Sequence, residues 1–181
     1  MQLPTGIENS FEIYRNNNGD VKAVVIGNRM DYFDLPCNLR EPFQAELIAD
    51  LPAQKCLQEM KIVDADQMEY KFVGCRYGIS DFISVSTEHK NLPDAPCCSD
   101  IKSCPGFNII CKVPAGKNGI LSRQEYLIVT LVSKGKLDKE IACELGIEIS
   151  TTRTHLARIR EKLCVNNRIE IAFWAMKKGI V

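Results

Sequence analysis

Cysteine is the residue type in this chain with the widest capacity for chemistry, and it occurs nine times. Five cysteines fall between Cys75 and Cys111, in a stretch without a helical or strand period that prolines interrupt. Four thiolates can hold one tetrahedral zinc ion, and folding around a metal would organise such a segment. We therefore expect a zinc site whose ligands are Cys75, Cys98, Cys104 and Cys111. An iron–sulfur cluster on the same ligands and unliganded thiols are the alternatives, since no Cys-x2-Cys pair is present.

A second group of residues combines hydroxyl side chains with cations in a segment of helical period, residues 150–163. At about 100° per residue, Thr152, Leu156, Ile159 and Leu163 share one face, which should be buried. The opposite face carries small and hydroxylated side chains, and cations flank it. Small residues allow a helix to approach base edges in the major groove, and cations reach phosphates. The candidate DNA-binding residues are Lys139, Ser150, Thr151, Arg153, Thr154, Arg158 and Lys162.

Four apolar-periodic segments position these residues between Leu121 and the C-terminus. Ser122 and Glu125 have the spacing of a capping box, which predicts the start of the first helix. Gly135 should stop it, and a second helix should open at Lys139 and close at Gly146. The helix over 150–163 follows, and a fourth is expected over about 167–178.

These residues resemble the LuxR/GerE-type helix-turn-helix domain of bacterial transcription regulators. The matching landmarks are Leu121, Glu125, Gly135, Lys139-Glu140-Ile141-Ala142, Leu145-Gly146-Ile147, Thr151, Arg153, His155, Ile159, Lys162-Leu163 and Val165-x-Asn167-Arg168-x-Glu170. The resemblance implies that helix 150–163 enters the major groove of double-stranded DNA. It also implies a homodimer formed through the C-terminal helix.

Two departures from the family pattern concern the ends of the third helix. Glu148 stands where the family has a serine N-cap, and glutamate caps less well. Cys164 replaces the family's glycine at a position that tends to be left-handed, at a cost of roughly 1 kcal/mol. Neither departure breaks the fold.

The sequence of the N-terminal half predicts an architecture different from that of the helical C-terminal part. Strands are expected over 11–14 and 21–27, an irregular stretch over 29–40, helices from Pro42 to Ala49 and from Pro52, and a strand over 67–75. The fold class is therefore an α+β N-terminal domain joined to an all-α four-helix C-terminal domain. We place the domains at 1–114 and 121–181, with a linker at 115–120. The acidic pair of a phosphorylation receiver and the aromatic pocket of a lactone-binding domain are both missing from the sequence.

The charge is divided unequally along the chain. Residues 1–114 carry 11 Lys/Arg and 16 Asp/Glu, whereas residues 115–181 carry 12 Lys/Arg and 7 Asp/Glu. A basic module joined to an acidic one is typical of a DNA-binding part attached to a sensing part. No apolar run is long enough for a membrane span, and the N-terminus does not resemble a signal peptide. We therefore expect a cytoplasmic protein without a membrane partner.

These patterns are compatible with three functions, in descending order of support from the sequence. The first is a sequence-specific, dimeric DNA-binding transcription regulator. The second is a metal- or redox-sensing regulator whose cysteine cluster controls DNA binding. The third is an enzyme with an accessory DNA-binding tail, which is weak because no catalytic triad or phosphate loop occurs. We therefore expect a protein that is not an enzyme. The sequence names no small-molecule effector, operator or direction of regulation.

Overall fold

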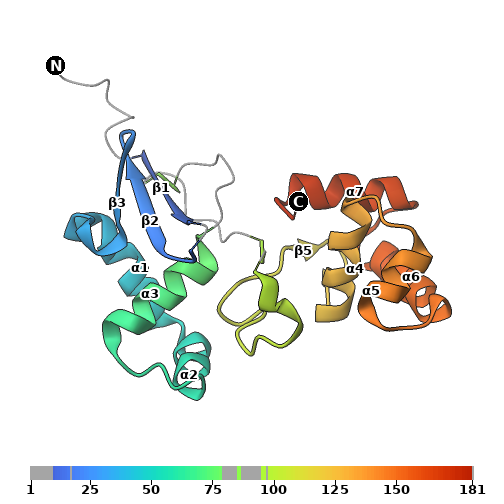
Figure 1. The fold of residues 1–181 in the computed structure, drawn as a ribbon, viewed down its shortest axis with the longest axis horizontal. Coiled ribbons are helices and arrows are strands. Elements are labelled where there is room, and N and C mark those ends of the chain that lie inside the picture. Colours follow the sequence, from blue (N-terminus) through green and yellow to red (C-terminus); the bar gives the residue numbers. More distant parts are fainter. Residues whose placement is uncertain (1–9, 17, 79–84, 87–94, 97, 181) are drawn as a thin grey trace. The chain divides into compact units, whose positions relative to one another are not determined.

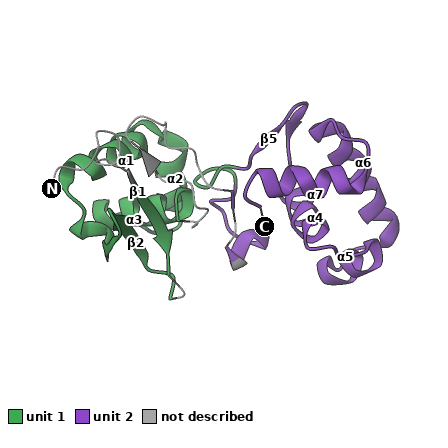
Figure 2. Ribbon diagram, turned by 90° about the horizontal axis from the view of Figure 1, so that it is seen from above, with its two compact units in different colours: residues 1–94, 108–112 green, residues 95–107, 113–181 purple. Residues whose placement is uncertain are grey.

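The computed structural model describes the whole chain except residues 1–9, 17, 79–84, 87–94, 97 and 181 (Figure 1). The chain forms two compact units, which Figure 2 shows in different colours. Unit 1 comprises Met1–Asp94 and Asn108–Lys112, and unit 2 comprises Ala95–Phe107 and Val113–Val181. The predicted combination of an α+β N-terminal part and a helical C-terminal part is confirmed.

Unit 1 is built on an antiparallel sheet of four strands in the order β3-β2-β1-β4. Side chains alternate between the two faces of a strand, so one face of β1 and β2 collects buried apolar residues, including the cross-strand pair Ile13 and Ala23. The two strands predicted over 11–14 and 21–27 are confirmed, and β3 adds a strand in the stretch expected to be irregular. The strands are β1 Ser10–Arg15, β2 Val21–Val25, β3 Asn28–Asp31 and β4 Val85–Ser86.

Helices cover the apolar face of this sheet. Phe43 of α1 meets Phe11 of β1 edge to face, with ring centroids 6.0 Å apart, and Phe72 and Val73 of α3 are fully buried beside them. The side chains of Asp50 and Asp64 cap α2 and α3 by accepting hydrogen bonds from backbone amides. The helical elements of unit 1 are the short 3₁₀ turn η1 Tyr32–Asp34, α1 Cys37–Ala49, α2 Leu51–Glu59 and α3 Ala65–Arg76.

Helix α1 begins five residues before Pro42, where we predicted its start. Proline lacks the amide that would bond to the carbonyl of Asn38, but Asn38 is exposed, so water can satisfy that carbonyl. The extra turn adds Leu39 to the buried stripe of Phe43 and Leu47. Burial of this stripe outweighs the missing hydrogen bond.

The strand predicted over 67–75 is wrong, because these residues belong to α3. Its buried positions Glu69, Phe72, Val73 and Arg76 recur at helical spacing. Glu69 accepts hydrogen bonds from Tyr32, Arg40 and Gln44 at 2.6–3.1 Å. These hydrogen bonds compensate for the cost of burying the Glu69 carboxylate. Because the partners are distant in sequence, the local pattern could not predict them.

Arg76 fixes the short segment Asn108–Lys112 to unit 1. Its guanidinium donates to Glu46 and Asp50 at 2.7 Å and to the carbonyl of Ile110 at 2.8 Å. Ile110 is buried in the same core. The fully buried guanidinium of Arg76 thus has two carboxylate partners and a carbonyl partner. Because that carbonyl belongs to Ile110, the segment Asn108–Lys112 is part of unit 1, although the chain on either side of it is not.

Unit 2 contains four helices around one core. Tyr126, Ile128, Ile141, Ile159 and Ile171 come from all four helices and are almost completely buried. The predicted capping box at the start of α4 is confirmed, since Ser122 and Glu125 exchange side chain to backbone hydrogen bonds. The helices are α4 Arg123–Ser133, α5 Asp138–Leu145, α6 Ile149–Leu163 and α7 Arg168–Lys177 (Figure 1).

Residues 95–107 pack against α4, so unit 2 begins earlier than the boundary that we predicted at residue 114. The ring of Phe107 meets that of Tyr126 edge to face at 5.7 Å, and Ile101 joins the same core. Arg123 donates to the carbonyls of Lys102 and Cys104 at 3.1 and 2.7 Å. A short 3₁₀ turn, η2 Ser99–Lys102, lies within this segment.

The segment predicted as a linker, 115–120, is instead a hairpin of β5 Ala115–Gly116 and β6 Gly119–Ile120. Asn118 donates from its backbone to the carbonyl of Lys162 at 2.8 Å and from its side chain to that of Glu161 at 2.9 Å. The last carbonyls of a helix have no partner within the helix, and the hairpin satisfies two of those in α6. The hairpin therefore holds the C-terminal end of α6.

Candidate nucleic-acid interface

Helices α5 and α6 form a compact pair joined by a tight turn. Helix α5 ends at Gly146, whose φ of 65° is left-handed as predicted for its C-cap. The amide of Ile147 then bonds back to the carbonyl of Ala142 at 3.0 Å, and α6 begins two residues later, at Ile149. This connection fixes the direction in which α6 leaves α5.

Helix α6 has one buried face and one exposed face, as the sequence predicted. Thr152, Leu156, Ile159 and Leu163 are buried in the core of unit 2. Between Ser150 and Arg158, the side chains that face solvent are small, hydroxylated or cationic. These exposed residues are Ser150, Thr151, Arg153, Thr154, Ala157 and Arg158. Such a face can approach the edges of base pairs closely.

The N-terminal end of α6 lacks a side-chain cap. Glu148 is the N-cap, and its side chain accepts no hydrogen bond from the backbone of the helix, as expected from its departure from the family pattern. Its carboxylate instead accepts from the Ser150 hydroxyl at 3.0 Å, and its carbonyl accepts from the buried Thr152 hydroxyl at 3.2 Å. The first amides of α6 are left without a capping side chain, and such amides favour an anion.

Arg153 and Arg158, together with the exposed Arg160 nearer the C-terminal end, carry the positive charge of α6 toward solvent. The side chain of Arg153 is 73% exposed and lies 3.9 Å from Asp138 at its nearest approach. Asp138 is held more closely by Arg168, at 2.6 Å. Arg158 is exposed, and no described carboxylate lies within ion-pair distance of it. Both guanidiniums are therefore available to an external partner.

Lys139 lies in the first turn of α5 and is exposed. Lys162 has a different environment from the one that we predicted. Its ammonium donates to Glu125 at 2.7 Å and to the carbonyl of Ile120 at 3.1 Å, and its side chain is 32% exposed. The structure therefore brings Lys139 and the exposed residues of α6 to the surface, whereas the charge of Lys162 is neutralised within unit 2.

His155 and Arg168 lie beside the exposed face of α6 and at the start of α7, respectively. His155 is half-buried, and its Nδ1 has no hydrogen-bond partner among the described residues. Arg168 donates to Asp138 and to the carbonyl of Lys136, which links the start of α7 to the start of α5. This role of Arg168 could not be predicted from local sequence, because 30 residues separate it from Asp138.

The four cysteines predicted to bind zinc are divided between the two units. Cys75 and Cys111 belong to unit 1, and Cys98 and Cys104 belong to unit 2. Within the described ranges, no group of three or more histidine, cysteine, aspartate or glutamate side chains is placed to hold a metal ion. The zinc site stays a prediction.

The arrangement of α5, the turn and the exposed face of α6 defines unit 2 as a helix-turn-helix DNA-binding domain. Sequence comparison gives the particular family. Residues 119–175 match the family described as bacterial regulatory proteins, luxR family, so this part of the chain is a LuxR-family helix-turn-helix domain.

Three relatives with curated names match this chain over stretches of 59–71 residues. It is 37% identical over 71 residues to the transcriptional regulatory protein LiaR of Bacillus subtilis, 37% over 65 residues to UhpA of Salmonella typhimurium and 44% over 59 residues to DesR of Bacillus subtilis. These matches cover 37%, 36% and 33% of this chain and 34%, 33% and 30% of the respective relatives. The chain thus spans about one third of the length of these relatives, and unit 1 lies outside the family match. No described helix is both long and apolar enough to cross a membrane.

Proposed function

We propose that this protein is a sequence-specific transcription regulator that binds DNA as a homodimer. The observation that carries the proposal is the exposed face of α6, where Arg153 and Arg158 flank hydroxyl and methyl side chains while the opposite face is buried. The relatives that share this domain are named as transcriptional regulators, which supports the same class of function. A regulator of a bacterial chromosome would act in the cytoplasm.

In the proposed complex, α6 lies in the major groove and its exposed face, from Ser150 to Arg158, contacts the bases. Ser150, Thr151 and Thr154 are small enough to let the helix approach, and Arg158 would donate to base edges. Arg153 and Lys139 would contact phosphates. A phosphate contact contributes affinity that falls as salt rises, whereas a base contact contributes specificity.

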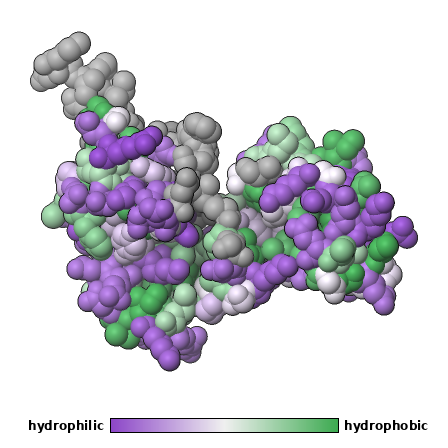
Figure 3. Space-filling model, viewed as in Figure 1, coloured by the Kyte–Doolittle hydropathy of each residue, from purple (hydrophilic) through white to green (hydrophobic). Residues whose placement is uncertain are grey.

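The proposed dimer contact is the outer side of α7. Ile169, Phe173 and Met176 are exposed and recur at helical spacing, so they form one apolar stripe. Ile169 is 81% exposed, and a contiguous apolar stripe of this kind, unlike a single exposed apolar residue, is typical of an interaction surface. Figure 3 shows apolar surface where Figure 1 places α7. A second copy of the chain would cover this stripe.

The direct test is selection of bound duplexes from a random DNA pool by the full-length protein. A sequence-specific dimer should enrich one motif with two related half-sites spaced by about one helical turn, 10–10.5 base pairs. The Phe173→Glu variant should enrich only a single half-site or no motif at all. A pool that stays random after repeated rounds would contradict sequence-specific binding.

A further inference from the structure

Strand β3 forms one edge of the sheet in unit 1. The strand order β3-β2-β1-β4 gives β3 a single neighbour, β2, and no other described strand pairs with its outer side. Asn28, Arg29 and Asp31 are exposed, and Met30 is half-buried. The outer side of an edge strand carries backbone donors and acceptors that can pair with a further strand. At β3, this sheet can therefore be extended.

The turn before β3 decides which of its backbone groups point outward. The hairpin loop between β2 and β3 has two residues, both with positive φ, 51° and 78°, as in a type I′ turn. The flanking residues, Val25 and Asn28, are then a hydrogen-bonded pair, and such pairs alternate with non-hydrogen-bonded pairs along an antiparallel ladder. The backbone N–H and C=O groups of Arg29 and Asp31 consequently point away from β2. Within the described ranges, neither of these two amides bonds to a backbone group outside the sheet.

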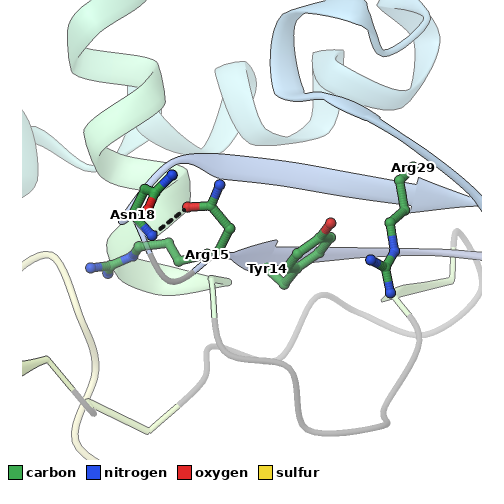
Figure 4. Close-up of a pocket in the computed structure, with 5 residues that line it drawn as sticks. Tyr14, Arg15, Asn18 and Arg29 are labelled. Carbon is green, nitrogen blue, oxygen red and sulfur yellow. Dashed lines mark hydrogen bonds between the residues drawn. The ribbon is translucent and has the colours of Figure 1, made fainter.

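The side chains of Arg29 and Asp31 lie on the face of the sheet opposite to the helices. Between them, Met30 pairs with a buried residue of β2, and alternate residues point to opposite faces. Asp31 forms an ion pair with Lys22 of β2, and its side chain is still 62% exposed. Figure 4 shows Arg29 on the same side of the strands as Tyr14, without a hydrogen bond to any residue drawn there.

These positions make the edge complementary to itself. If β3 of a second copy pairs antiparallel, with Met30 opposite Met30, each Arg29 faces an Asp31 of the other copy. The same register sets the outward backbone groups opposite one another, so each Arg29–Asp31 pair can exchange both of its hydrogen bonds. Opposite charges in directly facing positions stabilise a sheet, and like charges destabilise it. An edge shielded by lysines repels its own copy, whereas β3 carries one charge of each sign in symmetric positions.

Exposed apolar side chains stand just before and just after β3. Ile26 in the preceding turn is 49% exposed, and Phe33 in η1 is 42% exposed. Antiparallel pairing brings the turn of one copy toward η1 of the other, so Ile26 of one copy approaches Phe33 of the other. The φ of Ile26 is 51°, a strained conformation for a β-branched residue, and apolar contact with a second copy would offset that cost.

We infer that unit 1 associates with a second copy of this chain by antiparallel pairing of β3 with β3, which joins two sheets into one. A pairing of this length is weak by itself. Where α7 also joins the two copies, the β3 contact becomes intramolecular and gains from the higher effective concentration. The inference rests neither on DNA binding nor on the α7 contact, because all of its observations lie in unit 1.

The test is analytical ultracentrifugation of full-length protein that carries Phe173→Glu, which removes the proposed α7 contact. Added to this background, Arg29→Asp leaves two acids on each edge and Asp31→Arg leaves two arginines, so each variant repels its own copies. We expect either change to weaken self-association at least about tenfold. An equimolar mixture of the two variants should recover the association of the Phe173→Glu protein, because every acidic edge then meets a basic one.

Lys55→Asp in the same background is the matched control, since Lys55 is an exposed cation on α2 and lies outside the sheet. It should associate as the Phe173→Glu protein does. Hydrogen exchange gives a second readout: the amides of Arg29 and Asp31 should exchange more slowly as the protein concentration rises, whereas those of Asn28 and Met30, directed at β2, should not change.

Three results would overturn the inference. The first is equal association of the Arg29→Asp and Lys55→Asp proteins. The second is a mixture of the Arg29→Asp and Asp31→Arg proteins that associates no better than its components. The third is a Phe173→Glu protein that stays monomeric up to millimolar concentration. Loss of the α7 contact alone would leave all three comparisons intact, so the two contacts can fail separately.

Discussion

Lys162 and Glu125 form an ion pair of 2.7 Å that ties the C-terminal end of α6 to the first turn of α4. Glu125 also accepts a hydrogen bond from the amide of Ser122 at 2.7 Å, so one buried carboxylate serves both the capping box and the ion pair. The lysine that the sequence placed at the DNA therefore has a structural role in orienting the recognition helix.

This ion pair predicts a pH dependence of stability. Burial raises the pKa of Glu125, but hydrogen bonds from Lys162 and Ser122 outweigh it, and the net shift is downward. A carboxyl group with a lowered folded-state pKa stabilises the fold fully above its unfolded pKa of about 4.3, and this stabilisation is lost as the pH falls through the folded-state pKa. Glu125→Gln should lower the unfolding free energy at neutral pH by about 1–3 kcal/mol and flatten its decline in acid.

The fluorescence of Trp174 can follow this transition, because it is the only tryptophan and lies in unit 2. Glu161→Gln is the control, since Glu161 is exposed on α6. If the Glu125→Gln and Glu161→Gln proteins showed the same acid profile as the wild type, the ion pair would contribute nothing to stability.

Cys164 predicts a stabilising substitution. It is the C-cap of α6 with a φ of 58°, a left-handed conformation that glycine adopts without the steric cost of a Cβ atom. Cys164→Gly should raise the unfolding free energy of unit 2 by roughly 1 kcal/mol. Cys164→Ala keeps the Cβ atom and removes only the thiol, so thermal unfolding of the two variants separates backbone strain from other effects. Equal midpoints for the glycine and alanine variants would show that strain is absent.

The ends of the C-terminal helices could be predicted because their signals are local. Ser122, Gly146 and Cys164 act through the backbone of their own helix, and the spacing of Leu156, Ile159 and Leu163 reports the buried face directly. The exposure of Arg153 and Arg158 follows from the same period.

The features that the sequence did not predict depend on contacts between distant residues. Met68, Tyr70 and Phe72 alternate as in a strand, but the partners that bury Glu69 and Arg76 lie 25–37 positions away. The role of Lys162 was missed for the same reason, since 37 residues separate it from Glu125. Residues 95–107 have no period, and only contacts such as that of Phe107 with Tyr126 assign them to unit 2.

The Phe107→Ala variant tests whether residues 95–107 belong to unit 2. Its ring is buried against Tyr126, and the guanidinium of Arg123 lies over it at 5.1 Å. Phe107→Ala should destabilise unit 2 by about 3–5 kcal/mol, the usual cost of emptying a buried phenylalanine position. Hydrogen exchange should show faster exchange of the α4 amides while the amides of β1 and β2 keep their protection. Unchanged protection of α4 would mean that residues 95–107 are not part of the folded unit.

The predicted zinc site can be tested by elemental analysis. If Cys75, Cys98, Cys104 and Cys111 hold one zinc ion, elemental analysis of the purified protein should find about one equivalent, without visible absorption. Removal of the metal should destabilise the ordered regions that contain these residues. Brown protein would favour an iron–sulfur cluster. Metal-free protein of undiminished stability, with all nine thiols titratable, would exclude both sites.

The central claim is that the exposed face of α6 reads DNA, and the most direct measurement is the affinity of Arg153→Ala and Arg158→Ala for the selected duplex at fixed salt. Each variant should bind about 1–3 kcal/mol more weakly while Trp174 fluorescence shows an intact unit 2. Arg158→Ala should lose more affinity for the selected duplex than for random DNA, because a base contact carries specificity. Lys55→Ala, a change outside unit 2, should bind as the wild type does. Wild-type affinity in both arginine variants would contradict the account.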